Sequence, residues 1–190
     1  MPHTDVSLCA TALAKLGARP IASFDEPTAE AETAARLYPV VRDATLMAHP
    51  WSFTLAHARL DRDPESPAGD FAFAFRLPAD ILRTISAGSG GTGRGLVYRV
   101  FGGRLHTDAD SVLLTYQRRP PEAEFPAYFV PVLVARLAAE FCLPLTENAA
   151  RAEVLSRLAA SELKLAKLID SQQATPQRVE DFTLLQARLA

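Results

Sequence analysis

Cysteine and lysine are both scarce in this chain, and each shortage excludes a class of protein. Only two cysteines, Cys9 and Cys142, occur among 190 residues, too few for the disulfide framework of a small secreted domain. Each lies within an apolar helical pattern, so we expect two buried, reduced thiols. Lysine occurs three times and the formal net charge is −2, so no overall basic field is available to hold nucleic acid.

Long apolar runs are also missing. No segment reaches the roughly 18–20 apolar residues that cross a membrane, and residues 1–7 lack the basic-then-apolar order of a secretion signal. We therefore expect no membrane contact, and a protein made and used in the cytoplasm or packaged in a particle assembled there. With 48% hydrophobic and 22% charged residues, the composition is that of an ordered globular protein.

A glycine-rich segment, Gly88 to Gly95, contains a literal match to the dinucleotide-binding pattern GxGxxG. That motif needs a preceding strand and a following helix whose N-terminus faces the pyrophosphate, whereas the following residues, LVYRVF, alternate as a strand does. It also fails as a Walker A loop, because Arg94 stands where lysine belongs. We interpret the segment as a hairpin loop whose role stays open.

No catalytic or metal-binding pattern is recognisable. The four histidines have no two-ligand spacing, both cysteines fall at core positions, and no serine has a nucleophile-elbow context. We therefore predict no enzymatic activity, no catalytic residue, no metal site and no cofactor. His49 is interpreted as a basic group that suits the dipole at the end of a helix.

Apolar periodicity and end signals predict four helices. They cover about residues 5–16, 28–47, 126–143 and 147–169, and Pro39 is expected to kink or break the second. The last helix has an apolar face that we expect to pack against the others: Val154, Leu155, Leu158, Leu165, Leu168 and Ile169.

Between residues 53 and 117 the period changes to that of strands. Short apolar runs alternate with turns and no helical pattern separates them, which is typical of an antiparallel sheet with hairpins. The predicted fold class is therefore α+β: a four-helix base, an inserted antiparallel β-rich lobe and an extended C-terminal tail. The predicted boundaries are 1–52 with 120–170 for the base, 53–119 for the lobe and 171–190 for the tail.

Two residues near the end of the second helix are candidates for an interface. Arg42 is favoured as the partner of Asp43 in a surface ion pair; alternatively it folds back onto carbonyls around Pro39 or crosses to a neighbouring subunit. Trp51 is favoured as a plug, with Phe53, between the helices and the sheet, and the alternative is an exposed binding residue.

Several stretches occur in an order that resembles the tail tubular protein A family. They are LGARPI (16–21), AARLYPVVRDATLMAHPWSF (34–53), FAFAFRLPADILR (71–83) and FVPVLVARLAAEFCLPLT (129–146). Proteins of that family are the head–tail adaptors, or gatekeepers, of short-tailed phages and related particles.

The resemblance implies a structural virion protein without catalytic residues. It implies self-association into a ring of about twelve copies, placed between the portal protein and a distal tail (nozzle or stopper) protein. Double-stranded DNA passes through the lumen during genome ejection without specific binding. The implied location is the head–tail junction of a virion or phage-like particle, with assembly in the host cytoplasm.

The tail from residue 171 to 190 is polar with a few spaced apolar residues, as in segments that become ordered on a partner. Our hypothesis is that Phe182, Leu184 and Leu185 contact the portal or an adjacent subunit, so that deleting the residues after Asp170 abolishes ring attachment and leaves a folded monomer. The alternative function is that of a non-viral structural or scaffold protein whose β lobe binds a protein partner.

Overall fold

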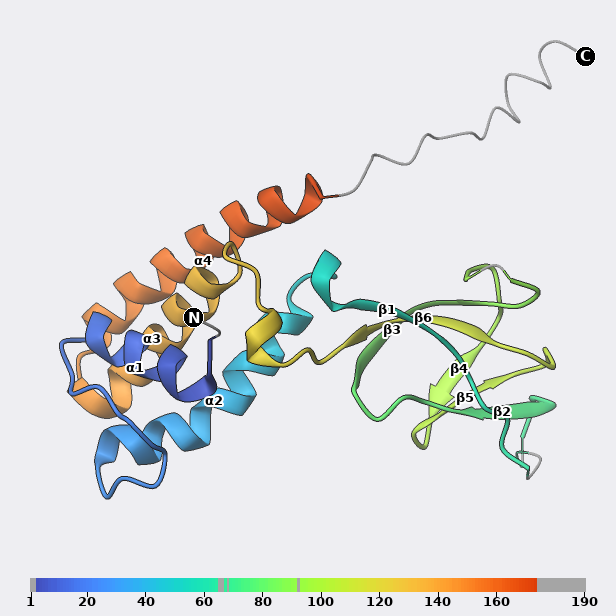
Figure 1. Ribbon diagram of the computed structural model, residues 1–190, viewed down its shortest axis with the longest axis horizontal. Coiled ribbons are helices and arrows are strands. Elements are labelled where there is room, and N and C mark those ends of the chain that lie inside the picture. Colours follow the sequence, from blue (N-terminus) through green and yellow to red (C-terminus); the bar gives the residue numbers. More distant parts are fainter. Residues whose placement is uncertain (1–2, 65–66, 68, 92, 174–190) are drawn as a thin grey trace, which may run out of the picture.

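The computed structural model describes residues 3–64, 67, 69–91 and 93–173. It is a mixed α+β protein with helices at one end and two small three-stranded antiparallel sheets at the other (Figure 1). The helices are α1 (Asp5–Lys15), α2 (Ala29–Met47), α3 (Val130–Thr146) and α4 (Ala149–Ser171), with short 3-10 turns η1 (Ser52–Thr54) and η2 (Glu122–Glu124). No helix of this described part is long and apolar enough to cross a membrane.

Helices α1, α2 and α4 begin where short polar side chains cap them, whereas α3 begins after Phe129 without a side-chain cap. Thr4 and Ser7 form a reciprocal capping box at α1, Thr28 accepts from the backbone N–H of Ala31 at α2, and Asn148 accepts from Arg151 at α4. The predicted break at Pro39 is absent, because α2 runs through it as one helix.

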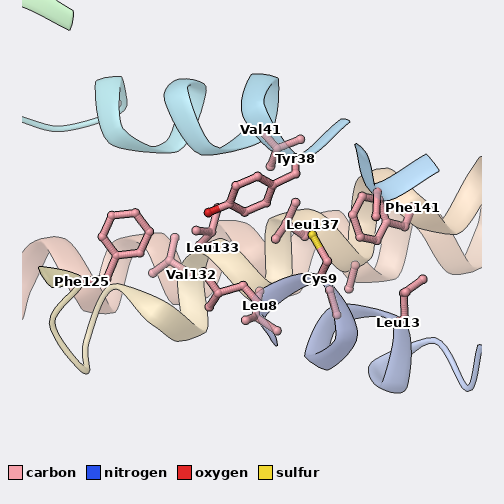
Figure 2. Packing of buried hydrophobic residues seen from close by; sticks show 14 of the residues in the cluster. Leu8, Cys9, Leu13, Tyr38, Val41, Phe125, Val132, Leu133, Leu137 and Phe141 are labelled. Carbon is pink, nitrogen blue, oxygen red and sulfur yellow. The ribbon is translucent and has the colours of Figure 1, made fainter. Parts of the chain in front are cut away.

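Helix α3 lies at the centre of the helical end and packs against α1, α2 and α4. Its side chains are almost all apolar, so every face that meets a neighbour can be buried. Figure 2 shows Leu133 and Leu137 of α3 between Tyr38 of α2 and the side chains of α1. Cys9 and Cys142 lie in this core as free thiols, and burial, followed by the charge of Asp5, raises the pKa of Cys9 to about 12.

Helix α4 corrects the sequence prediction for four of the six residues of its apolar face, whereas Leu155 packs, partly buried, against the helical core as predicted. Its large side chains Val154, Leu158, Leu165 and Leu168 point to solvent, with exposed fractions of 46–58%. The buried positions are instead Ala159, Ala166 and Asp170. Alanine lets the backbones of α3 and α4 approach closely at these positions, and Leu163 packs beside them, partly buried, against the same core.

The sheets have the strand orders β1-β6-β3 and β2-β5-β4. Their strands are β1 (Leu55–Arg59), β2 (Phe73–Arg76), β3 (Ile81–Gly88), β4 (Arg99–Phe101), β5 (Arg104–Thr107) and β6 (Leu113–Arg118). The sequence of β1, LAHAR, has little β propensity, and its pairing with β6 places it in the sheet. The sheets bury a second, smaller core around Phe75, Leu105 and Leu114.

Candidate functional site: the helix–sheet junction

Trp51 fills the point where the chain leaves α2 and enters the sheets. Its side chain is 0% exposed, and its ring meets those of Phe129 and His49 edge-on at centroid distances of 5.3 and 5.0 Å. The indole N–H donates to the backbone oxygen of Thr45 at 3.1 Å, so the only polar group of the side chain is satisfied. The plug interpretation agrees with this geometry. It corrects the expectation that Trp51 contacts a partner, because the ring has no free surface.

Gln117 of β6 ties the sheet to the same point. Its buried amide nitrogen lies 2.7 and 2.8 Å from the backbone oxygens of Leu46 and His49, and 3.0 Å from Oγ1 of Thr54. Its amide oxygen accepts from Arg83 Nε at 2.8 Å. A fully satisfied amide of this kind fixes the orientation of the strand relative to the end of α2.

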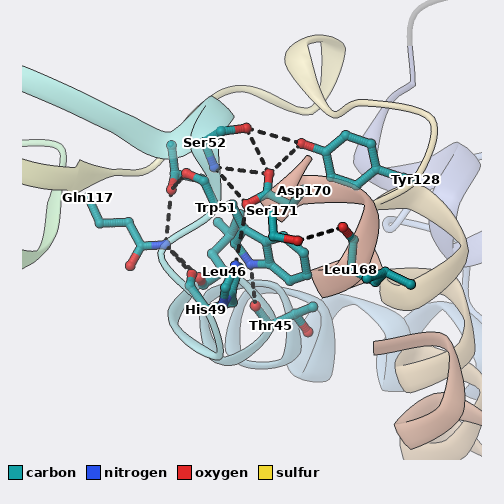
Figure 3. A network of polar contacts seen from close by, with 11 residues as sticks. Thr45, Leu46, His49, Trp51, Ser52, Gln117, Tyr128, Leu168, Asp170 and Ser171 are labelled. Atoms are coloured by element: carbon teal, nitrogen blue, oxygen red, sulfur yellow. Dashed lines mark hydrogen bonds and ion pairs between the residues drawn. The ribbon is translucent and has the colours of Figure 1, made fainter. Parts of the chain in front are cut away.

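Asp170, at the last turn of α4, is the centre of a polar network (Figure 3). Although it is 5% exposed, it accepts from the backbone N–H of Ser52 at 3.0 Å and from the hydroxyls of Ser52 and Tyr128, both at 2.7 Å. Burial, together with the Asp170 carboxylate, raises the pKa of Tyr128 to about 12, so its hydroxyl remains a donor. The carboxylate therefore joins α4, the segment before α3 and the start of the β region.

His49 completes the network, with Nε2 3.3 Å from Asp170 Oδ2. Burial lowers its pKa below the ordinary value, opposed by Asp170 and assisted by the positive charges of Lys167 and Arg83. The folded protein therefore binds this proton less well than the unfolded chain does. The stability that depends on neutral His49 is fully present above about pH 6.5 and is lost as the pH falls through and below that value.

We expect His49→Gln to flatten the pH dependence of folding. Urea unfolding between about pH 7.5 and about pH 5 should show the free energy of unfolding of the unmodified protein falling more steeply than that of the variant. His57→Gln is the matched control, because His57 is exposed on β1. Parallel curves for His49→Gln and the unmodified protein would contradict the assignment.

Arg42 belongs to a second group of charges beside the junction. Its Nε donates to Asp43 at 2.9 Å and its Nη1 to Glu122 at 3.2 Å, while Arg119 pairs with Asp43 from the other side. Burial alone would lower the pKa of Arg42, but Asp43 and Glu122 raise it overall. Arg42 therefore makes the predicted pair with Asp43 and, unpredicted, joins α2 to η2.

Two of the predicted interface residues lie in the described part of the chain, each with its own contacts. Arg42 belongs to α2 and Trp51 follows the end of that helix, whereas Phe182, Leu184 and Leu185 lie outside the described residues. Sequence reasoning missed Ser52, Gln117, Tyr128 and Asp170. No local pattern marks them, since each acts on residues tens of positions away.

Within the described ranges, no three His, Cys, Asp or Glu side chains are grouped to hold a metal ion. After Gly88 the next described element is the strand β4, so no helix faces the glycine-rich segment as a dinucleotide site requires. A scan against models of known protein families finds none that matches the chain. A search of curated proteins likewise finds no match.

Proposed function

We propose that this protein is a structural head–tail adaptor of a phage-like particle. It would form a ring, of about twelve copies by family resemblance, between the portal and a distal tail protein, with DNA passing through the lumen. In this proposal α1–α4 are a four-helix base that docks on the portal, the two sheets are the inserted lobe, and residues 171–190 are the tail.

The observation that carries the proposal is the packing together of the two stretches with the strongest family resemblance. Residues 34–53 and 129–146 are separated by the whole β region, yet they share one core. Trp51 meets Phe129 at 5.3 Å, and Tyr38 and Leu133 lie in the same cluster (Figure 2). The two stretches are therefore parts of one structural unit. This supports the proposal, because two stretches that together resemble one family should belong to the same folded unit.

The hydrogen bonds and ion pairs at the junction support a structural role, in which the helices and the sheets keep a fixed orientation, rather than a catalytic role. Asp170, Gln117 and the Arg42 group link helices to sheets through paired polar contacts, which resist rotation about the connecting segments. An adaptor held between two particle components needs such fixed geometry. The net charge of −2 suits a lumen along which DNA moves, since phosphate neutralisation would cause adhesion.

The test is to purify particles from a lysate of the source and quantify this chain against the major capsid protein by mass spectrometry. A fixed ratio near twelve copies per particle is expected for a symmetric ring. Absence from every particle fraction would overturn the proposal.

We expect a chain that ends at Gln173 to fold but to be absent from particles. The cut lies after Gln173 because Asp170 and Ser171 belong to α4 and its bonding. The truncated protein should keep its far-UV circular dichroism spectrum and a cooperative melt, while mass spectrometry of particles finds less than about a tenth of the normal amount if the tail supplies about 1.4 kcal/mol or more of attachment. Normal incorporation would show that Phe182, Leu184 and Leu185 are not attachment residues.

One observation favours the alternative of a scaffold protein whose lobe binds a protein partner. Strand β4 is one edge of its sheet, and all three of its residues are exposed. Phe101 is 48% exposed, and its ring stacks on that of His106 at a centroid distance of 3.7 Å. An edge strand with apolar side chains can accept a further strand. Mass spectrometry of purified particles distinguishes the two functions, because the adaptor would be present at a fixed ratio and the scaffold protein would be absent.

A further inference from the structure

Helix α4 carries a row of large apolar side chains on its outer side, which we call the α4 stripe. It consists of Val154, Leu158, Leu165 and Leu168, whose exposed fractions are 46–58%. With Ser161 at the middle, the spacing is four, three, four and three residues, which is the a/d spacing of a helix that packs along another helix. An exposed apolar row of this kind marks a surface that meets a partner.

A groove runs between α2 and α4, with α3 as its floor. Two hollows of about 410 and 560 Å³ share Ala139 and Glu140 of α3 and Ser156 of α4, so they form one continuous groove, which we call the α3 groove. Small side chains such as Ala139, Ser156 and Ala160 leave it open, and Leu143 at one end is 53% exposed. A groove of this shape accepts a helix with large apolar side chains.

The stripe and the groove lie on opposite sides of α4. Ser156, in the wall of the groove, and Leu165, in the stripe, are nine residues apart, which is about two and a half helical turns. One copy of the chain therefore cannot place its own stripe in its own groove, whereas the stripe of a second copy can enter it.

We propose that the α4 stripe of one copy docks in the α3 groove of the next copy and so joins the subunits head to tail. The inference rests on the proposed function, because it names the contact between neighbouring subunits of the ring. An interface of two different surfaces generates a ring when the rotation between neighbours closes. In a closed ring both surfaces of every copy are covered by one kind of contact.

The lengths of the two surfaces agree. The floor of the groove extends from Arg136 to Pro144, which is about 12 Å of α3. The central part of the stripe, from Leu158 to Leu165, is about 10 Å of α4. Ser161 lies between these two leucines, and its small side chain lets the docked helix approach the floor of the groove closely.

The charges also complement one another. Arg136 and Glu140 line the groove, and in the described part of the chain neither side chain has an ion pair or a hydrogen bond. Glu162 and Lys164, which lie beside the stripe, have no such partner among the described residues either. Each charge in the groove therefore has an opposite charge available on the docked helix, which favours a second copy as the occupant.

Mixing two variants of the purified chain tests the contact. Ser156→Trp fills the groove from an exposed position, and Leu158→Gln with Leu165→Gln removes the centre of the stripe. Sedimentation of the unmodified chain should show a mass that grows with concentration up to about 1 mM, and each variant alone should associate at least about tenfold more weakly. An equimolar mixture should form a dimer that grows no further, because one variant keeps its stripe and the other keeps its groove.

Two further variants are the matched controls. Ser156→Ala keeps the groove open, and Val97→Gln removes an apolar side chain that is 79% exposed on the β lobe. Both should associate like the unmodified chain. Circular dichroism and a cooperative melt establish that each variant is folded.

The other outcomes would overturn the proposal. If Ser156→Trp alone associates like the unmodified chain, stripes pair with each other or another surface joins the copies. An unmodified chain that stays monomeric at about 1 mM, or a mixture that forms no dimer, would also contradict the contact. The particle test is separate: a mixed dimer with absence from particles would keep the contact and reject the adaptor function, and presence in particles without a mixed dimer would do the reverse.

Discussion

Trp51→Ala is expected to lower the free energy of unfolding by about 3–5 kcal/mol, the usual loss for removing a buried aromatic side chain. The ring is 0% exposed and meets Phe53, Tyr128 and Phe129 as well as His49. Deleting it leaves a cavity where three segments meet, and the Thr45 carbonyl loses one of its two donors and keeps the backbone N–H of Ala48. For a chain of this length the melting temperature should fall by roughly 6–20 °C.

The measurement is urea unfolding followed by circular dichroism, because Trp51 is the only tryptophan and its fluorescence is lost in the variant. Trp51→Phe should lose less, about 1–2 kcal/mol, since most of the ring volume is kept and mainly the N–H bond disappears. Val97→Ala is a control at a 79% exposed apolar position and should change stability by less than about 0.5 kcal/mol. A loss below about 1 kcal/mol for Trp51→Ala would contradict the plug role.

The parts of the fold that could be predicted depend on local chemistry. Thr4 and Thr28 mark helix starts because a hydroxyl near the first free N–H groups acts over three residues. The α+β class follows from the change of period after Phe53, and the structure has strands in that region. Of the kink or break expected at Pro39, the break is absent, because packing of α2 against α3 outweighs one missing backbone bond.

The rest could not be predicted because it depends on which surfaces meet. Helix α4 has apolar residues on two sides, and periodicity alone favoured the side with large residues. The contact with α3 selected instead a face with Ala159 and Ala166, beside which Leu155 packs partly buried. Strand β1 and the Gln117 bonds likewise depend on partners far along the chain. A long-range acceptor such as Asp170 has the same local sequence signal as any charged residue at a helix end.

Asp170→Ala is expected to have the second largest effect, a loss of about 3 kcal/mol in the free energy of unfolding. The substitution removes the acceptor that the N–H and hydroxyl of Ser52 share with the hydroxyl of Tyr128, at a position that is itself 5% exposed. Charged acceptors contribute more than neutral ones, so the loss should exceed that of an ordinary hydrogen bond. Asp170→Asn keeps the shape and one acceptor and should lose about 1–2 kcal/mol.

Hydrogen exchange should locate the damage as well as measure it. If Asp170 fastens the end of α4 to the start of the β region, amides of residues 165–171 and 52–55 should exchange faster together in Asp170→Ala, while those at the centre of α3 change little. Ser171→Ala is the matched control, because that exposed hydroxyl donates within α4, to the backbone oxygen of Leu168. Faster exchange confined to α4 would mean that the carboxylate caps its own helix and does not join the two regions. Faster exchange in both segments would instead show that the Asp170 carboxylate holds the end of α4 and the start of the β region in their relative orientation.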